Sequence, residues 1–314
     1  MILNRRQMFS AGLSLAGITA MGLGAQACAQ QGLPPVKATD LGAGLFVLEG
    51  AGGHVGVSVG KDGVFVIDSQ YAPIAPKLIE KISELSPEPI KLLLNTHWHG
   101  DHVGGNAVFK AAGAEIMAHK NVLTRVSAPQ AWPTLGFPDA EPIPVAGRPT
   151  RLLDDEGLVF KQNGQTILVK HEPTAHTDGD VWVYFVEADV IHAGDLSFHQ
   201  IFPFIDVDTG GTIDGYIAGQ EAIIAAAGPA TKIITGHVKQ GGNPVTNRDG
   251  VAGDVALLKS VRAKMAKVVA DGMSLEQALA AKPIAEEAKT LDWRFITEER
   301  MVRLVYADLK RQLG

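Results

Sequence analysis

From residue 40 onward, short apolar runs alternate along the chain with longer segments whose hydrophobic positions follow helical spacing. The short runs predict strands bounded by glycine-rich turns. In the first half they lie at Leu45–Glu49, Val55–Val59, Val64–Asp68, Ile90–Asn95 and Glu115–Ala118. Apolar residues three and four positions apart predict helices at Pro73–Leu85 and Gly104–Ala112.

A proline-rich stretch separates this half from the next. Six prolines between Arg125 and Thr150 predict an extended excursion that is not itself a regular element. Beyond it, strands are expected at Leu158–Phe160, Thr166–His171, Val181–Val186, Val190–His192 and Lys232–Thr235, with a helix at Ile213–Ala227.

The last quarter of the chain has a helical pattern. Ser274 and Gln277 have the spacing of a capping box before Leu275–Ala281, and Glu298–Gln312 forms a final amphipathic helix. No linker composition interrupts the chain after residue 30. We therefore expect one α/β domain over residues 30–314, with a helical C-terminal extension over about 241–314.

Composition excludes several classes of protein. The chain has 314 residues, 46% hydrophobic and 20% charged, with one Cys, so it is neither disordered nor stapled by disulfides. The formal net charge is 28 − 34 = −6, from 28 Lys and Arg residues and 34 Asp and Glu residues, and aromatic residues make up 6% of the chain. This balance favours a small-molecule substrate over nucleic acid, and nothing in the pattern sets an oligomeric state.

The first 29 residues have the pattern of a signal peptide. Arg5 and Arg6 precede a soft apolar run over Ala11–Ala27, which resembles a twin-arginine export signal. The run is too short and too polar for a membrane span, so the mature protein is expected to be periplasmic or secreted. Cleavage after Ala27 would leave Cys28 available for a lipid anchor, a minority alternative.

The strongest chemical signal follows the predicted strand that ends near Leu94. Residues 95–102 read Asn-Thr-His-Trp-His-Gly-Asp-His, which places three imidazoles and a carboxylate within six residues. Imidazole and carboxylate suit Zn²⁺ and related divalent cations, and a strand end fixes their directions. Because one cation does not readily take four side chains from so short a loop, the spacing predicts two adjacent cations.

Further ligands of the same chemistry follow later strands. His176 lies beyond the strand that ends near His171, Asp195 comes directly after Val190–His192, and His237 follows the strand at Lys232–Thr235. Taken singly, each of these residues could be an ordinary turn residue or a hydrogen-bonded histidine. Their repeated placement just past strand ends favours convergence on one rim.

These residues resemble the motifs of the metallo-β-lactamase superfamily of hydrolases, in order and over most of residues 40–240. The resemblance implies an αββα sandwich with the site along one edge of its two sheets. It assigns His97, His99 and His176 to a first metal and Asp101, His102 and His237 to a second. Asp195 would bridge both metals, and Asp68 would orient the histidine loop.

The resemblance also narrows the chemistry. One lactamase subclass has Cys at the position of Asp195 and Lys three residues on; here Leu196-Ser197-Phe198 follows. The bridging Asp is more similar to the glyoxalase-II, lactonase and phosphodiesterase branches. The expected activity is hydrolysis of a small carbonyl substrate, a β-lactam, ester, thioester or lactone, by hydroxide generated between two zinc ions, with Asp101 moving the proton.

Two other functions stay open, and so does the metal. A basic cleft would favour a metal-dependent phosphodiesterase, and the same fold could serve a non-catalytic metal-binding protein. Iron and manganese also accept His and Asp ligands. Three residues are candidate substrate contacts: His54 in a glycine-rich turn, His199 after the Asp195 loop, and Trp132 in the proline-rich stretch, where it could form part of an apolar lid.

Overall fold

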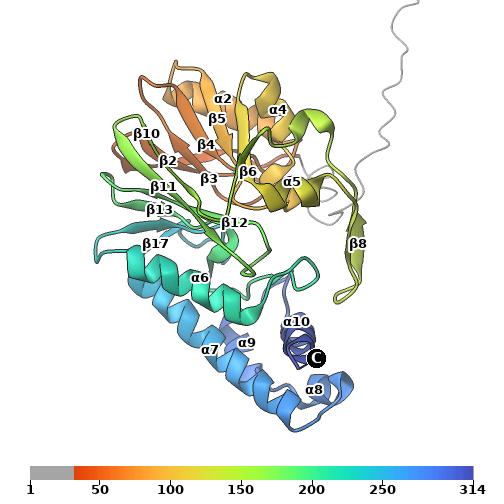
Figure 1. Ribbon diagram of the computed structural model, residues 1–314. Helices are drawn as coiled ribbons and strands as arrows, with labels where there is room; N and C mark the ends of the chain where they lie inside the picture. The colour runs from red at the N-terminus through yellow and green to blue at the C-terminus, as the bar shows by residue number, and fades with distance from the viewer. Residues whose placement is uncertain (1–31, 314) are drawn as a thin grey trace, which may run out of the picture.

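The computed structural model describes residues 32–313 and consists of two β-sheets packed face to face, with helices on both outer faces (Figure 1). This is the predicted αββα sandwich. The first sheet has seven strands in the order β1-β2-β3-β4-β5-β6-β9. They span Lys37–Gly42, Leu45–Glu49, Val55–Ser58, Val64–Ile67, Ile90–Leu94, Glu115–His119 and Arg151–Leu153.

The second sheet has six strands in the order β10-β11-β12-β13-β15-β17. They span Leu158–Gln162, Gln165–Glu172, Asp180–Phe185, Val190–His192, Lys232–Ile234 and Val245–Thr246. Two short pairs lie outside the main sheets: β14 (Phe198–His199) with β16 (His237–Val238), and β7 (Gln130–Trp132) with β8 (Phe137–Ala140).

Strand alternation explains why β5 is buried on both faces. Leu92 and Leu94 point into the core between the sheets, while Leu93 points to the helices on the outer face. Phe65 and Val66 on β4 divide in the same way. A continuous apolar run is therefore required here, whereas a strand with one solvated face would alternate with polar residues.

Helices cover each outer face. On the first sheet lie α2 (Ala75–Leu85) and α4 (Asn106–Ala111), with α3 (Gly100–Val103) and α5 (Lys120–Val126) beside the sheet ends. Figure 1 shows α6 (Ile213–Ala226) along the second sheet, with α7 (Arg248–Ala270) beside it. Ile223 of α6 and Val251 of α7 share a core with Ile191 and Ile233 of that sheet.

The C-terminal helices form a separate layer against α7. They are α8 (Leu275–Ala281), α9 (Ala285–Leu291) and α10 (Glu298–Arg311). The Ser274 hydroxyl accepts a hydrogen bond from the Gln277 backbone N–H, and the Gln277 side-chain oxygen accepts one from the Ser274 backbone N–H, so the predicted capping box is confirmed. Buried residues of all four helices share one core, among them Val261, Ala278, Leu291 and Met301. No helix within residues 32–313 is long and apolar enough to cross a membrane.

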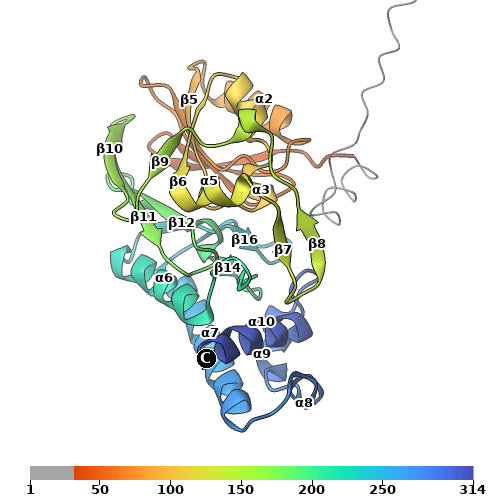
Figure 2. The ribbon, with the colours of Figure 1, turned by 45° about the vertical axis from the view of Figure 1, so that its right-hand side comes forward.

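The prediction of an element-free excursion over residues 125–150 was wrong. The stretch contains the end of α5, the hairpin β7–β8 and a 3₁₀ turn at Val145–Gly147. A two-stranded ribbon has free edges, so Pro138 can sit in β8 without removing a needed ladder bond. In Figure 2 this hairpin runs from the first-sheet side toward α10, where Phe137 stacks on Phe295 with ring centroids 5.4 Å apart.

Two other features differ from the sequence pattern. Strand β1 was not predicted because it is an edge strand whose residues are mostly exposed and lack apolar alternation. The helix expected at Gly104–Ala112 is present as the shorter α4, and a separate short helix that was not predicted, α3, ends just before Gly104. The predicted leader over residues 1–29 and Cys28 lie outside the described residues.

Candidate metal centre

Loops that follow strands of both sheets meet at one edge of the sandwich. Residues 95–102 follow β5, Asp195 follows β13 and His237 follows β15, and each of these strands has a parallel neighbour. Parallel strands end at the same edge, so the polar residues after them converge. The structure thereby brings together all seven residues expected from the sequence to bind metal.

The first group consists of His97, His99, His176 and Asp195, whose candidate ligand atoms lie within 4.8 Å of one another. His99 Nδ1 is 2.8 Å from His176 Nε2. The Asp195 Oδ2 atom is 3.7 Å from His97 Nε2 and 3.5 Å from His176 Nε2. All four residues are buried, so the candidate ligand atoms are shielded from solvent.

The second group consists of Asp101, His102 and His237. Asp101 Oδ2 is 3.1 Å from His237 Nε2 and 3.6 Å from His102 Nε2. The Asp195 carboxylate also reaches this group, with Oδ1 3.1 Å from His102 and Oδ2 3.3 Å from His237. Asp195 therefore touches both groups and lies where a bridging ligand must lie.

Two features of the donor set fit divalent cations. His97 Nε2 is buried and has no hydrogen-bond partner among the described residues, although a buried polar atom normally has one. His102 Nδ1 is bonded to Asp68 Oδ2 at 2.7 Å, so a neutral His102 turns the Nε2 lone pair toward Asp195 Oδ1. A cation between these acceptors would satisfy each of them.

Asp68 orients the histidine loop through three hydrogen bonds. Its carboxylate accepts from the backbone N–H of Thr96 at 2.8 Å, from the Thr96 hydroxyl at 2.7 Å and from His102. Asp68 itself has a φ of 67°, a left-handed conformation that Asp tolerates better than most residues. Its contacts are those of a residue that fixes a metal-binding imidazole from behind.

Asp206 orients another histidine and was not identified from the sequence. Its buried Oδ2 accepts hydrogen bonds from His99 Nε2 and from the indole N–H of Trp132, both at 2.9 Å. This leaves His99 Nδ1 as the lone-pair donor facing His176. Asp206 directly follows the apolar residues 201–205, and an acidic residue after such a run was the available signal.

Trp132, expected as a lid residue or substrate contact, is buried in the wall of the site. Its ring stacks on Trp98 with centroids 5.5 Å apart and an interplanar angle of 9°. The turn between β7 and β8 is fixed as well, because the backbone N–H and the hydroxyl of Thr134 both donate hydrogen bonds to the Asp208 carboxylate. The hairpin is thus built into the fold around the first ligand group.

Aromatic rings complete the wall. Phe204 stacks on His99 with centroids 5.4 Å apart, and its backbone carbonyl accepts a hydrogen bond from His176 Nδ1. Phe198 stacks on His237 at 4.9 Å. These rings exclude water from one side of both ligand groups.

Two glycines allow the chain to approach the ligands closely. A Cβ atom on Gly53 would lie 2.1 Å from His102 Cε1, and one on Gly236 would lie 2.1 Å from Asp195 Oδ1. Any side chain at either position would displace a candidate ligand.

The two groups differ in protonation. Burial lowers the pKa of His176 to about 3, with His99 adding to the effect, and burial together with His102 lowers the pKa of His97. Burial opposes the charge of His237 as well, but Asp195 and Asp101 outweigh it and raise its pKa to about 9. The pKa of His102 rises for the same reason, through Asp195, Asp101 and Asp68.

The carboxylates respond in the opposite direction. Burial would raise the pKa of Asp101, but His102 and His237 hold it at about 2. The pKa of Asp195 falls well below its usual range through His102, His237 and His97, despite the same penalty from burial. Both carboxylates are therefore ionised near neutral pH.

A cavity of about 330 Å³ lies beside the second group. Its lining includes Gly52 and His54 from one side and Val238 and Lys239 from the other. The His54 ring is buried, with Nδ1 bonded to the Thr235 carbonyl at 2.7 Å. Burial and the neighbouring His237 lower the pKa of His54 to about 4, so a neutral imidazole borders the cavity.

His199 and a third histidine cluster have other partners. His199 Nδ1 bonds to Asp254 at 2.7 Å, which ties β14 to α7. His119 and His171 stack with centroids 3.7 Å apart beside Asp155. The candidate ligand atoms of these three residues also lie within 4.8 Å of one another, but the Asp155 carboxylate is 65% exposed and already lies 3.0 Å from the ammonium group of Lys120.

Comparison with known proteins agrees with this geometry. The family model of the metallo-beta-lactamase superfamily matches residues 49–237, which hold every candidate ligand. The chain belongs to this superfamily. Together with the His and Asp cluster, this makes it a candidate metal-dependent hydrolase.

Individual relatives match only part of the chain or have low sequence identity to it. The chain is 33% identical over 127 residues to hydroxyacylglutathione hydrolase GloC of Haemophilus influenzae, over 40% of this chain and 57% of that enzyme. Two metallo-beta-lactamase structures share the fold. The one from Pontibacter korlensis has a TM-score of 0.57 and 15% identity, covering 71% of this chain and 99% of that one. DIM-1 has a TM-score of 0.56 and 15% identity, covering 73% and 99%.

A third structural neighbour extends further along the chain. It is a double mutant of the sec-alkyl sulfatase PisA1, with a TM-score of 0.62 and 14% identity. The match covers 89% of this chain and 50% of the sulfatase. At this identity, all three structures show the fold alone.

Proposed function

We propose that this protein is a hydrolase of small carbonyl substrates that works with two divalent cations, zinc in the first place. The observation that carries the proposal is the Asp195 carboxylate, which lies within 3.7 Å of histidines in both ligand groups. The seven candidate ligands would hold two cations, which when bound would supply an acidified water molecule at neutral pH and polarise the carbonyl oxygen.

The protein groups divide the remaining work. His97 and His176 lie in a buried wall and have lowered pKa values, so they offer lone pairs without a preceding proton loss. Asp101 is ionised and 15% exposed, and with His237, 20% exposed, it is on the open side of the site. Its carboxylate can accept a hydrogen bond from the attacking water, take up the proton and pass it to the leaving group.

An ester, thioester or lactone is the favoured substrate within this class. GloC is by its name a hydrolase of a glutathione thioester, and an aspartate, not a cysteine, holds the bridging position here. A β-lactam is the competing carbonyl substrate. Nitrocefin and a panel of thioesters and lactones separate the two, and bis(p-nitrophenyl) phosphate tests the phosphodiesterase alternative.

Metal content provides the first test. Purified protein should contain about two equivalents of metal, mostly zinc, with iron and manganese as the alternatives. His97→Ala and Asp101→Ala should remove metal-dependent turnover while leaving the circular dichroism spectrum unchanged. His119→Ala removes an equally buried histidine outside both ligand groups and serves as the matched control. Full activity in chelator-stripped protein would contradict the proposal.

We also propose that the protein acts outside the cytoplasm, because Arg5 and Arg6 precede an apolar run at the start of the chain. Fractionation of cells expressing the native sequence, compared with Arg5→Lys/Arg6→Lys, tests this. We expect the native chain to be exported and the double variant to be retained in the cytoplasm.

A further inference from the structure

Arg125, in the last turn of α5, has a guanidinium group that reaches three separate segments of the chain. Its side chain is 26% exposed. Nη2 donates a hydrogen bond to Asp178 Oδ2 at 2.6 Å, and Nε donates to the same carboxylate at 3.2 Å. Nη2 also donates to the Thr209 carbonyl at 3.0 Å, and Nη1 donates to Gln130 Oε1 at 3.2 Å. All three guanidinium nitrogens therefore have acceptors, and these acceptors lie far apart in the sequence.

Two of these partners come just after residues of the metal centre. Asp178 lies two residues after His176, and Thr209 lies three residues after Asp206. The two segments also meet directly. The Asp206 backbone N–H donates to the His176 carbonyl at 2.9 Å, and the Thr209 N–H donates to the Asp206 carbonyl at 3.1 Å. Arg125 therefore bridges the two segments a second time, through Asp178 and Thr209.

The third partner connects the β7–β8 hairpin. Gln130 begins β7, two residues before Trp132, whose indole N–H donates to Asp206. The side chain of Gln130 contacts Arg125 twice, because its oxygen accepts from the guanidinium and its Nε2 donates to the Arg125 carbonyl at 3.1 Å. The guanidinium thus fixes the beginning of the strand that carries Trp132.

Helix α5 also packs directly on the segment that follows His176. Asn121, one turn before Arg125, donates from Nδ2 to the Asp178 carbonyl at 2.7 Å. A Cβ atom on Gly179 would lie 3.2 Å from Val122 Cγ2 and 3.4 Å from Asn121 Cβ. The guanidinium of Arg125 therefore lies against a segment that has little room to shift.

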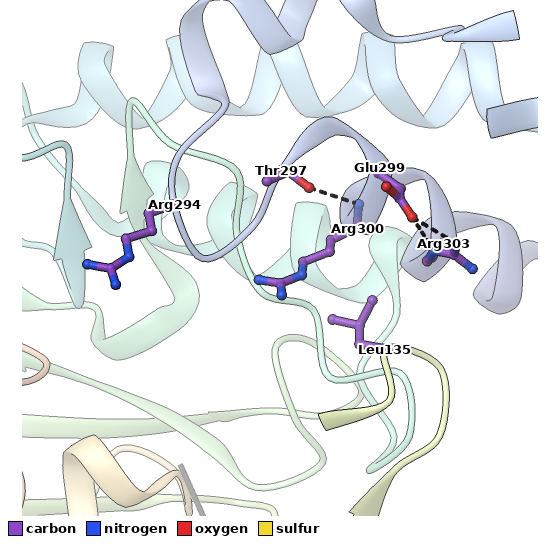
Figure 3. Close-up of a pocket in the computed structure, with 6 residues that line it drawn as sticks. All are labelled: Leu135, Arg294, Thr297, Glu299, Arg300 and Arg303. Carbon is purple, nitrogen blue, oxygen red and sulfur yellow. Dashed lines mark hydrogen bonds and ion pairs between the residues drawn. The ribbon is translucent and has the colours of Figure 1, made fainter. Parts of the chain in front are cut away.

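Two other arginines show the difference. Beside the cavity of about 450 Å³ between the β7–β8 hairpin and the start of α10, Arg303 pairs with Glu299, four positions before it on the same helix (Figure 3). Arg262 joins α7 to α6 through one partner, Asp214, with Nε and Nη2 2.9 and 3.1 Å from its two oxygens. In neither case does the partner adjoin a candidate metal ligand in the sequence. Arg125, in contrast, joins α5 to two loops and a hairpin that all lead to the first ligand group.

We propose that Arg125 is a positioning residue for the first ligand group. Its guanidinium holds the segments that carry His176, Asp206 and Trp132 in place relative to one another, and so sets the directions of His99 and His176. A planar guanidinium holds several acceptors at fixed angles, which the ammonium group of a lysine does not. The inference rests on the metal binding of the proposed function and is independent of the substrate.

Zinc affinity tests the proposal. A chromophoric chelator competes for zinc with the wild-type, Arg125→Met and Arg125→Lys proteins. Arg125→Met should weaken one of the two zinc-binding events about 10-fold, the lower end of the range for losing an outer partner of a metal ligand, and leave the other unchanged. Arg125→Lys keeps the charge beside Asp178 but loses the fork, so it should recover only a small part of the loss. Wild-type affinity in either variant would overturn the proposal.

Arg262→Met is the matched control for a general loss of stability. It breaks a two-point ion pair between α6 and α7 and should lower the free energy of unfolding without changing zinc affinity. Denaturant unfolding of both methionine variants gives the two losses of stability. If Arg262→Met weakened zinc binding as much as Arg125→Met at an equal loss of stability, general loosening would explain the data and the positioning role would be wrong.

Hydrogen exchange in the metal-free protein keeps the proposal separate from the proposed function. The backbone N–H groups of Asp206 and Thr209 are both hydrogen-bonded, so their exchange rates report how firmly their segment is held. About 10-fold faster exchange at these amides in Arg125→Met, but not in Arg262→Met, supports the proposal even if the protein hydrolyses none of the substrates tested. Equal exchange in the wild-type and both variant proteins overturns it, even if the protein is an active hydrolase.

Discussion

The two ligand groups of the metal centre contain similar residues in different surroundings. The first group is buried behind Trp132 and Phe204, and the pKa values of His97 and His176 are lowered. The second group is open at Asp101 and His237, and the pKa values of its histidines are raised. In the first group, burial and the neighbouring histidines outweigh Asp195 and lower the pKa values of His97 and His176. In the second group, Asp195 and Asp101 outweigh burial and raise the pKa of His237.

This difference assigns separate tasks to the two halves. In the buried group, His97 and His176 have lowered pKa values and offer neutral ligands in a fixed geometry. An open group with ionised carboxylates can receive substrate and exchange protons. Asp195 belongs to both groups, so it couples the fixed half to the reactive half.

Removing that coupling should have the largest effect. Asp195→Asn keeps the shape of the side chain but removes the charge that contacts both groups, so we expect loss of at least one metal equivalent. Activity should fall about 10⁴-fold, the scale for an essential member of a catalytic group. Metal analysis together with kcat/KM measures this. Two bound metals and unchanged turnover in the variant would show that Asp195 does not bridge.

A substitution that affects only the buried first group should have a smaller effect on metal binding. Asp206→Ala removes the acceptor that fixes His99, and we expect metal affinity to fall roughly 10- to 100-fold. Asp206→Asn keeps an acceptor for His99 Nε2 and should recover part of that loss. Competition with a zinc chelator measures both affinities. Identical behaviour of the two variants would mean that the hydrogen bond is not what orients His99.

The hairpin contact to Asp206 should have a smaller effect. Trp132→Phe keeps an aromatic ring against Trp98 but removes the indole N–H, so we expect metal affinity to fall about 5-fold, the scale of one hydrogen bond. The same chelator competition measures it. A loss as large as that of Asp206→Ala would indicate that the hairpin, not the carboxylate, holds the first group together.

The smallest effect is the pH dependence of stability in chelator-treated protein. The pKa of His237 is raised from 6.5 to about 9, so its contribution is complete below pH 6.5 and is lost as pH rises toward 9. The pKa values of His54 and His192 are lowered to about 4, so their contribution is present above pH 6.5 and is lost as pH falls toward 4. Denaturant unfolding should show maximum stability near pH 6.5.

Metal loading sharpens this prediction. When cations bind the second group, they compete with the protons of His102 and His237, so the decline in stability above pH 6.5 should disappear. The decline below pH 6.5 should remain, since His54 and His192 do not belong to either ligand group. A decline above pH 6.5 of the same size with and without metal would contradict the role of His237.

Much of the sandwich could be predicted from local patterns. The strands around Leu45–Glu49 and Ile90–Leu94 were expected almost residue for residue, because a strand buried on one or both faces shows apolar alternation or a continuous apolar run. Strand β1 and the β7–β8 hairpin escaped prediction. An exposed edge strand and a two-stranded ribbon need neither pattern, and the prolines of the hairpin sit where no ladder bond is required.

The sequence by itself determined the fold class and the set of candidate ligands. The histidine loop over residues 97–102 has a local spacing, and the resemblance to the superfamily added the sandwich fold and the assignment of His176, Asp195 and His237. Only the tertiary structure decided what holds each ligand in place. Asp206 reaches His99 across 107 positions of the chain and Trp132 across 74. Such partners are chosen by the packing of distant segments, and no local spacing encodes them.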